Sequence, residues 1–305
     1  MKLKWLALLL AVYFPVSAVQ AQRRAATPKT ASRTIVVMTE PAAVVWVDEV
    51  RRGVTDAEGK LQLTFAPGAH RLRVRAQGFA ERTLPLPPTQ RGVLAVKLIR
   101  TTDEATLLFQ RAEAARERAG GNAEAVELYR KALGLRPRFP EAHVGLARAL
   151  ASADDYDGAL EEVAAARRDR PAYAEASAVE GRILRSSSDY DAALTAYARA
   201  LREARGFQPE AHTGMGIVYE ETGRHEEAVA AFRKAIAQLS DTEPVLYELL
   251  GRNLEKLERW KEAVAAYEKY LALAPTGAHA SAVNSIIDQL RRQAAEQESP
   301  PPNQF

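Results

Sequence analysis

The stretch Ala193-Leu194-Thr195-Ala196-Tyr197-Ala198-Arg199-Ala200 decides the fold of the second half of the chain. Its two end alanines are seven residues apart, which is about two turns of an α-helix, so both lie on one face together with Tyr197. Small residues allow two helices to approach closely, and a large one fills the space beside the contact. The stretch therefore predicts a helix that packs tightly against a partner helix.

The same pattern recurs at intervals of 34 or 35 residues. The first small position is occupied by Ala125, Ala159, Ala193, Ala228 and Ala263, and the second by Ala132, Ala166, Ala200, Ala235 and Tyr270. The bulky position between them is occupied by Tyr129, Val163, Tyr197, Phe232 and Tyr267. Self-similarity at such a period predicts an array of stacked helical units.

This pattern resembles the tetratricopeptide repeat, a helix-turn-helix unit of 34 residues. Five helix pairs fit residues 101–277, with starts near Thr106, Pro140, Ala174, Pro209 and Pro244. Because one pair cannot bury its apolar face alone, the pairs are expected to complete one another's core as an all-α solenoid. Residues 278–298 carry an apolar stripe of Val283, Ile286, Ile287 and Leu290, which predicts a capping helix.

The resemblance also implies where a partner would bind. In tetratricopeptide proteins the first helix of each pair lines a concave groove that holds a protein segment. The matching positions are Glu141, Val144, Arg148, Glu175, Arg182, Arg185, Thr213, Ile217, Glu248 and Arg252. Their arginines can pair either with a partner's carboxylates or with glutamates of the groove itself, and both alternatives stay open. The asparagine and lysine with which chaperone-binding members hold a terminal carboxylate are absent from these positions.

Residues 34–100 have a different pattern, typical of a small all-β sandwich. Runs rich in β-branched residues lie at 34–39, 43–48, 60–65, 71–75 and 93–98, with turn-forming residues between them. In the fourth run, Leu72 and Val74 alternate with Arg71, Arg73 and Arg75. Alternation puts the three arginines on the outer face of the strand, as a basic stripe.

Several segments of this region resemble a PEGA domain. They are 40–48, 53–55, 67–74 and 78–79, and they follow the order and spacing of that family. The resemblance implies an extracytoplasmic accessory module with no catalytic chemistry. Two glycines of the family pattern are replaced, one by Ala42 and one, in the usual Asp-Gly turn, by Glu49. The first hairpin is therefore expected to differ in turn type.

The N-terminus reads as a secretory signal over residues 1–21. Lys2 and Lys4 precede an apolar run of about a dozen residues, and small residues end at Ala21. The run is shorter than the about 18 apolar residues of a membrane span, so we expect cleavage and an exported protein, periplasmic or secreted, without an integral span. Residues 22–33 are then a flexible basic linker, and residues 299–305 a disordered tail.

The charge and the sequence motifs of the chain limit the classes of function that it can have. The net charge of +3 is the sum of +2 over residues 1–21, +8 over residues 22–100 and −7 over residues 101–305. The chain has no cysteine, which removes disulfides and thiolate chemistry. His143 and His212 recur because the repeat recurs, so we interpret them as structural rather than metal-binding. We find no catalytic motif, phosphate-binding loop or nucleic-acid platform, and we predict no enzyme activity, cofactor, metal or nucleic-acid partner.

Three hypotheses for function remain. The first is a non-enzymatic scaffold of the bacterial cell envelope that binds a protein segment in the groove. The second is an envelope-polymer binder in which Arg71, Arg73 and Arg75 contact an anionic glycan or lipid surface. The third is intramolecular, with the positive β region folded onto the negative repeat array.

Overall fold

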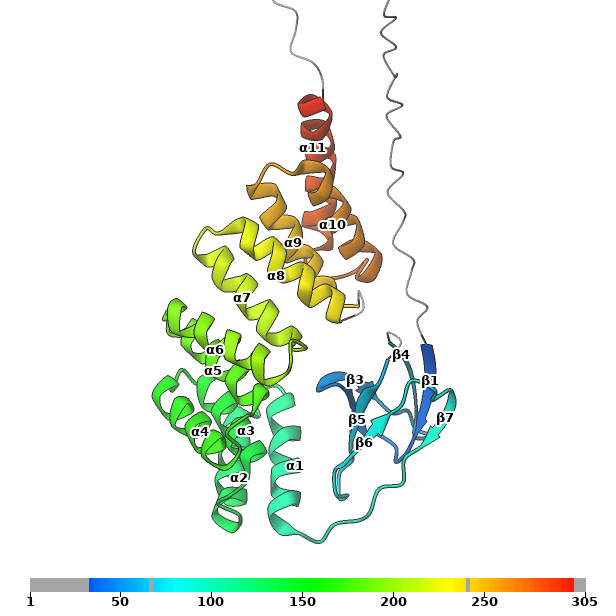
Figure 1. The fold of residues 1–305 in the computed structure, drawn as a ribbon, viewed down its shortest axis with the longest axis vertical. Helices are drawn as coiled ribbons and strands as arrows, with labels where there is room; N and C mark the ends of the chain where they lie inside the picture. The colour runs from blue at the N-terminus through cyan, green and yellow to red at the C-terminus, as the bar shows by residue number, and fades with distance from the viewer. Residues whose placement is uncertain (1–32, 66–67, 240–241, 299–305) are drawn as a thin grey trace, which may run out of the picture. The chain divides into compact units, whose positions relative to one another are not determined.

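The computed structural model describes residues 33–65, 68–239 and 242–298, and Figure 1 gives their fold. The expected signal peptide, all of the basic linker except Arg33, and the tail lie outside these residues. A β region of two sheets is followed by a helical array, so the predicted fold class is confirmed. Arg33, assigned above to the linker, is the first residue of a strand and donates to the carbonyl oxygen of Gly68 at 2.8 Å.

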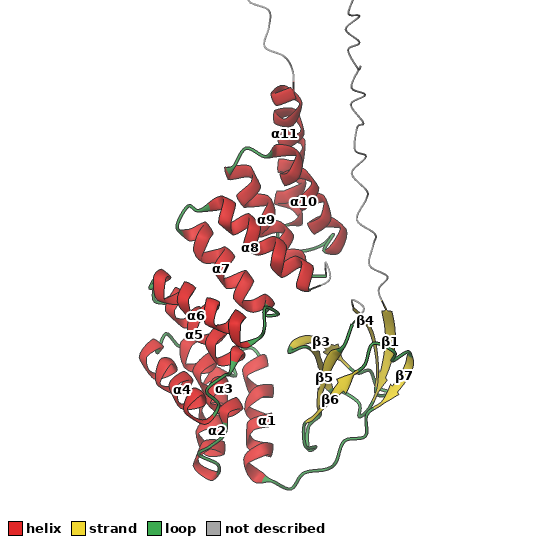
Figure 2. Cartoon of the chain, in the orientation of Figure 1, coloured by secondary structure: helices red, strands yellow, loops and turns green. Residues whose placement is uncertain are grey.

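Seven strands form the two sheets of the β region in the described residues (Figure 2). They are β1 (Arg33–Met38), β2 (Val44–Val47), β3 (Val50–Val54), β4 (Lys60–Phe65), β5 (His70–Arg75), β6 (Arg82–Leu86) and β7 (Gly92–Ala95). One sheet has the order β4-β1-β7 and the other β3-β2-β5-β6. The inward residues of β1, β2 and β5 are almost fully buried and make a single core between the sheets.

Two of these strands, β3 and β6, were not predicted. β3 has the sequence Val-Arg-Arg-Gly-Val and β6 has Arg-Thr-Leu-Pro-Leu, and neither shows the apolar alternation of a central strand. Both lie at the edges of their sheet. An edge strand has only one neighbour and tolerates charge and proline, so its sequence carries a weak signal.

Eleven helices follow in the described residues. They are α1 (Glu104–Glu117), α2 (Asn122–Leu135), α3 (Pro140–Ala151), α4 (Tyr156–Asp169), α5 (Ala174–Ser186), α6 (Tyr190–Glu203), α7 (Pro209–Glu221), α8 (His225–Gln238), α9 (Pro244–Lys256), α10 (Trp260–Leu273) and α11 (Ala280–Glu298). Asp103, Asp155 and Asp189 cap three of them, and proline begins three more. Four of the pairs begin where the repeat pattern predicts, and the first begins two residues earlier, at Glu104.

The small and bulky columns pack as the repeat pattern predicts. The alanines of both small columns have no exposed surface, and the bulky column is 3% exposed or less. Glycines of the first helices make room for the rings: a Cβ on Gly251 would lie 2.6 Å from the Tyr267 ring. Val283, Ile287 and Leu290 of α11 close the last cluster.

The first helices of successive pairs pack against one another, namely α1 with α3, α3 with α5, and α5 with α7. We call the face that they form, continued by α9, the inner face. Among the described residues, α7 and α9 are not a closely packed pair. The inner face is therefore more open between α7 and α9 than between the earlier helices.

Candidate functional site

The inner face carries a chain of ion pairs centred on Arg148 of α3. Its guanidinium donates to Glu175 of α5 at 2.7 Å and lies 3.7 Å from Glu210 of α7. Burial raises the pKa of Glu175, but Arg148 and Arg73, with hydrogen bonds from Arg148 and Tyr173, outweigh it and bring the pKa to about 2. The three charges link successive first helices, α3, α5 and α7.

A second group of charges surrounds Glu113 of α1. Its carboxylate accepts hydrogen bonds from the Tyr129 hydroxyl and from Arg75 of β5, the latter at 3.2 Å, and Arg116 lies 3.6 Å away. Burial raises the pKa of Glu113, yet Arg116, Arg75 and Tyr129 together hold it below its usual range. Glu113 occupies the position at which the last three repeats have Gly181, Gly216 and Gly251, so in the first repeat a carboxylate and not a glycine meets the bulky residue.

Five other predicted groove residues are paired within the chain or buried. Arg185 and Arg252 pair within the chain, with Glu221 at 3.0 Å and Glu220 at 2.9 Å. Glu141 pairs with Arg170 at 2.5 Å, and Glu248 with His279 at 2.7 Å. Val144 is only 1% exposed and packs in the core, so it does not line a groove. The reason is that its side chain packs in the apolar cluster shared by α1 to α5, which leaves almost none of it at the inner face.

Arg182 differs from these arginines because it makes no ion pair with any residue that the structure describes. It is half-buried on the inner face of α5. Burial lowers the pKa of Arg182, Glu210 raises it, and the neighbouring cation Arg148 lowers it further. A cation in this position favours a carboxylate from outside the chain.

A hollow of about 410 Å³ lies beside Arg182. Four of the predicted groove residues line it: Arg182, Arg185, Thr213 and Ile217. Further apolar lining comes from Val245 and Leu246 of α9, and Val245 is 52% exposed. The hollow lies between α7 and α9, which are not closely packed. Apolar side chains and the Arg182 guanidinium therefore line the same space.

The turn between β2 and β3 forms another part of the wall, through Glu49 and Val50. Asp48 and Glu49 have φ values of 51° and 65°, the left-handed values of a type I′ turn. The Asp48 carboxylate accepts from the backbone N–H of Arg71 at 2.8 Å and lies 2.5 Å from Nδ1 of His70. The Glu49 carboxylate lies 3.0 Å from the Arg73 guanidinium. The turn is thus firmly held at the hollow.

The basic stripe of β5 is mostly engaged inside the chain. Arg73 and Arg75 have side chains that are only 11% exposed, and both stack on Trp46, at 4.4 and 5.0 Å from the ring centre. Arg75 also binds Glu81 at 2.8 Å. Of the three arginines, only Arg71 is exposed. The sequence alternation places the three arginine side chains on one face of the strand, as the structure has them. It does not reveal that Arg73 and Arg75 are covered by other side chains.

Several contacts join the β region to α1. The side-chain oxygen of Gln110 accepts from the N–H of Gly78 at 2.9 Å, and its amide donates to the carbonyl of Phe79 at 2.7 Å. Arg51 of β3 lies 3.1 Å from Glu117. These are the contacts that the intramolecular hypothesis requires. Sequence reasoning missed Gln110 at this junction and Glu49 at the hollow.

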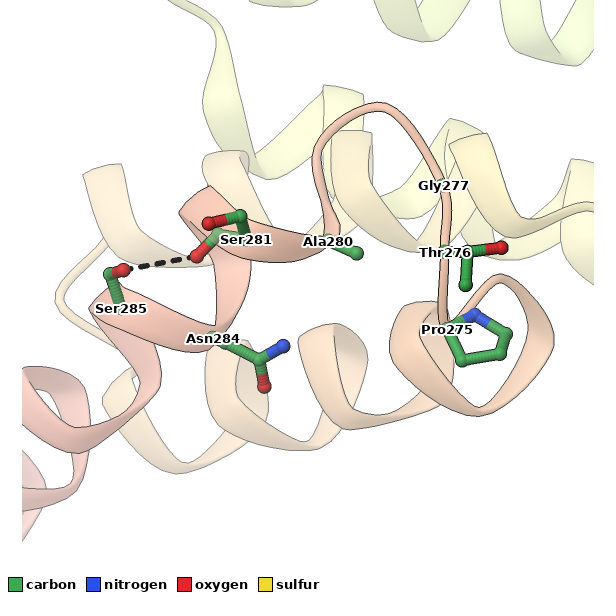
Figure 3. A pocket seen from close by; sticks show the side chains of 7 residues that line it. All are labelled: Pro275, Thr276, Gly277, Ala280, Ser281, Asn284 and Ser285. Carbon is green, nitrogen blue, oxygen red and sulfur yellow. Dashed lines mark hydrogen bonds between the residues drawn. The ribbon is translucent and has the colours of Figure 1, made fainter.

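A second, more open hollow of about 600 Å³ lies between α10 and α11 (Figure 3). It is lined by the turn at Pro275–Gly277 and by small polar residues of α11, where the Ser285 hydroxyl donates to the carbonyl of Ser281 at 3.0 Å. Among the described residues, no charged or aromatic side chain lines it. We therefore place the candidate site at the first hollow.

Metal-binding clusters and membrane-spanning helices are both absent from the described residues. No cluster of three or more histidine, aspartate or glutamate side chains is arranged to hold a metal ion. None of the helices that the structure describes has the length and apolar character needed to cross a bilayer.

The stacked helix pairs define a helical-repeat solenoid. Profiles of the tetratricopeptide repeat match residues 118–183, 179–244 and 245–276, which together make up more than half of the chain. The chain therefore belongs to the tetratricopeptide repeat family. No curated protein matches it by sequence.

Solved structures share this fold. The TPR protein TTC0263 of Thermus thermophilus is 22% identical with a TM-score of 0.51, over 62% of this chain and 99% of that chain. PilF of Pseudomonas aeruginosa is 18% identical with a TM-score of 0.54, over 63% and 88%. PilW, a type IV pilus biogenesis factor, is 17% identical with a TM-score of 0.53, over 65% and 96%. At these identities the likeness concerns the fold alone.

Proposed function

We propose that this protein is a non-enzymatic scaffold that binds a protein segment on its inner face. The observation that carries the proposal is the hollow in which Arg182, without an ion pair among the described residues, lies beside the apolar side chains Ile217 and Leu246. Such a combination suits a peptide that brings both a carboxylate and an apolar side chain. The tetratricopeptide repeat family, whose members typically bind proteins rather than catalyse reactions, supports the same proposal.

The engagement of the basic stripe favours this function over binding of an anionic glycan or lipid. Arg73 and Arg75 are paired with glutamates, so Arg71 is the one member of the stripe that is exposed to meet a charged surface. Sedimentation of the purified protein with cell wall or anionic vesicles tests that alternative. Strong binding that weakens with salt would support it, and the Arg71→Ala variant would then lose it.

We further propose that the protein is exported to the cell envelope and that its β region is a PEGA-type accessory module. Both proposals rest on sequence, the first on residues 1–21 and the second on the segments within 40–79. N-terminal sequencing of the protein from its native host tests the first. A mature chain that begins at Gln22 would support export, and an intact Met1 would contradict it.

Charge reversal tests the proposed function directly. Full-length protein with Arg182→Glu and Arg185→Glu is compared with a control in which two exposed arginines of second helices are reversed, Arg168→Glu and Arg202→Glu. Partners are captured from an extract of the native host and quantified by mass spectrometry. We expect the inner-face variant to lose at least fivefold of a partner that the wild type and the control retain. Equal recovery from all three would place binding elsewhere.

A further inference from the structure

We propose that the hollow is a composite binding site, formed by the repeats together with the β2–β3 turn. In this proposal it binds one acidic and one aliphatic side chain of a partner segment. The proposal rests on the proposed function and deepens it. It assigns the acidic side chain to Arg182 and the aliphatic one to the surface of Ile217, Val245 and Leu246.

The preference for an acidic side chain follows from the charge of Arg182, which is unpaired among the described residues. Three of the charged groups that line the hollow with it have partners: Arg185 has Glu221, Glu210 has Arg148, and Glu49 has Arg73, whereas Glu243 makes no ion pair among the described residues. Arg182 is left without an ion pair among the described residues. A planar guanidinium presents several donors in a fixed arrangement that matches a carboxylate. The fitting ligand group is therefore an aspartate or glutamate side chain, or a terminal carboxylate.

The aliphatic half follows from the floor of the hollow. Val245, the second residue of α9, is 52% exposed, whereas Leu246 beside it is 2% exposed. Val50 lines the same hollow from the β2–β3 turn. Unbranched polar side chains gain nothing from such a surface, whereas burial of an aliphatic chain is favourable in proportion to its area. The volume of about 410 Å³ is sufficient for a short segment with one such side chain.

The part played by the β2–β3 turn follows from its backbone. Glu49 has a φ of 65°, a left-handed conformation that suits glycine and costs free energy in any residue with a Cβ. The strained backbone at a glutamate directs attention to what its side chain contacts. Here it lies at the wall of the hollow, where burial raises its pKa, Arg73 lowers it and Glu175 raises it. A carboxylate on this side repels the partner's acidic group and directs it to Arg182.

The rigidity of the turn supports its role as a wall. Asp48 is held by the backbone of Arg71 and by His70, and Arg73 is stacked on Trp46 while it pairs with Glu49. The turn needs no ordering when a partner enters, which lowers the entropic cost of binding. The β region therefore completes the site instead of serving as a spacer alone.

A defined probe tests the chemistry of recognition. Three fluorescein-labelled peptides are titrated against the full chain: one with aspartate two positions before leucine in a glycine-serine frame, one with asparagine for the aspartate, and one with serine for the leucine. We expect the first to bind at least tenfold more tightly than both others. Arg182→Gln should remove the preference over asparagine, and Val245→Ser the preference over serine. Lys131→Gln, on the exposed side of α2, should change neither preference.

A second measurement tests the composite nature of the site. Because the chain has no cysteine, pairs of cysteines can be introduced and joined with a short bis-maleimide. Val50→Cys with Thr213→Cys should cross-link, since both residues line the hollow, and Glu58→Cys with Thr213→Cys should not. The aspartate-leucine peptide should slow the first reaction at least threefold. Helix content by circular dichroism verifies that each variant is folded.

Each outcome has a defined meaning. Equal affinity for the three peptides, or no binding of any, overturns the proposed recognition. Absence of the Val50–Thr213 cross-link overturns the composite site. If either happens while reversal of Arg182 and Arg185 still abolishes partner capture, the proposed function stands and only this inference falls. If capture is also unchanged, both fall.

Discussion

Arg75 of β5 donates to the Glu113 carboxylate of α1 at 3.2 Å, while its guanidinium lies 4.8 Å from the centre of the Phe109 ring. This contact ties the β region to the first helix pair. It also relates to the charge asymmetry of the chain, because a cation of the positively charged residues 22–100 pairs here with an anion of the negatively charged residues 101–305. Arg75 is almost covered, so the pair is shielded from solvent and from salt.

Removal of Arg75 is expected to weaken this junction. Arg75→Ala takes one cation from Glu113 and from Glu81 and leaves two partly buried carboxylates less compensated. We expect a loss of about 2–4 kcal/mol in the free energy of unfolding, and faster hydrogen exchange in α1. Arg71→Ala, on the same strand but exposed, should cost less than about 0.5 kcal/mol. Urea denaturation of the full chain measures both, and equal losses would contradict the role given to Arg75.

Two glycine-to-alanine substitutions in helices should act in opposite directions. A Cβ at Gly251 would lie 2.6 Å from the packed Tyr267 ring, so Gly251→Ala is expected to destabilise the protein by about 1–3 kcal/mol. Gly134 in α2 has open space around it, so Gly134→Ala should stabilise by up to about 1 kcal/mol through helix propensity. Thermal denaturation followed by circular dichroism compares them. A stabilising Gly251→Ala would mean that the ring moves aside freely.

Two histidines at equivalent repeat positions should give opposite pH dependences. Burial lowers the pKa of His143, but hydrogen bonds to Glu162 and the Pro137 carbonyl raise it above its ordinary value. Its stabilising effect is full below the unfolded pKa of about 6.5 and is lost as the pH rises through the folded pKa. Burial and Lys234 lower the pKa of His212, so its contribution is present above about pH 6.5 and is lost as the pH falls.

Glutamine substitutions separate the two effects. His143→Gln should destabilise more at about pH 5.5 than at about pH 8, and His212→Gln should destabilise less at about pH 5.5 than at about pH 8. Urea midpoints of the two variants and the wild type at both values measure the difference. Parallel pH profiles would show that neither imidazole titrates differently in the folded chain.

The helical half of the fold could be predicted because its signal is repeated five times. Each alanine column records the same close contact between helices, and a large residue in one position is matched by a small one opposite, as with Tyr267 and Gly251. The edge strands β3 and β6 carry no comparable signal, because one side of each has no strand neighbour among the described residues.

The candidate site was only partly predictable for a related reason. The repeat register fixes which residues of the first helices face inward, and so Arg182, Thr213 and Ile217 were identified. It does not fix how deeply each of these residues is buried, and Val144 is 1% exposed within the core cluster. Glu49 contributes to the hollow only because of the way in which the β region packs against the helices. No periodic sequence pattern predicts that packing. Its one local signal was a glutamate where the family pattern has glycine.

Replacement of Glu49 by glycine should separate stability from recognition. Glu49→Gly relieves the left-handed backbone, worth about 1–2 kcal/mol, and loses a half-exposed ion pair to Arg73, worth about 0–1 kcal/mol. The net expectation is a chain as stable as the wild type or slightly more stable, which urea denaturation measures. In the turn between β3 and β4, Glu58 has no positive φ, so Glu58→Gly should destabilise by about 0.5–1 kcal/mol. If Glu49→Gly instead destabilised as much as this control, the glutamate would serve the stability of the hairpin, and its position at the hollow would need no functional explanation.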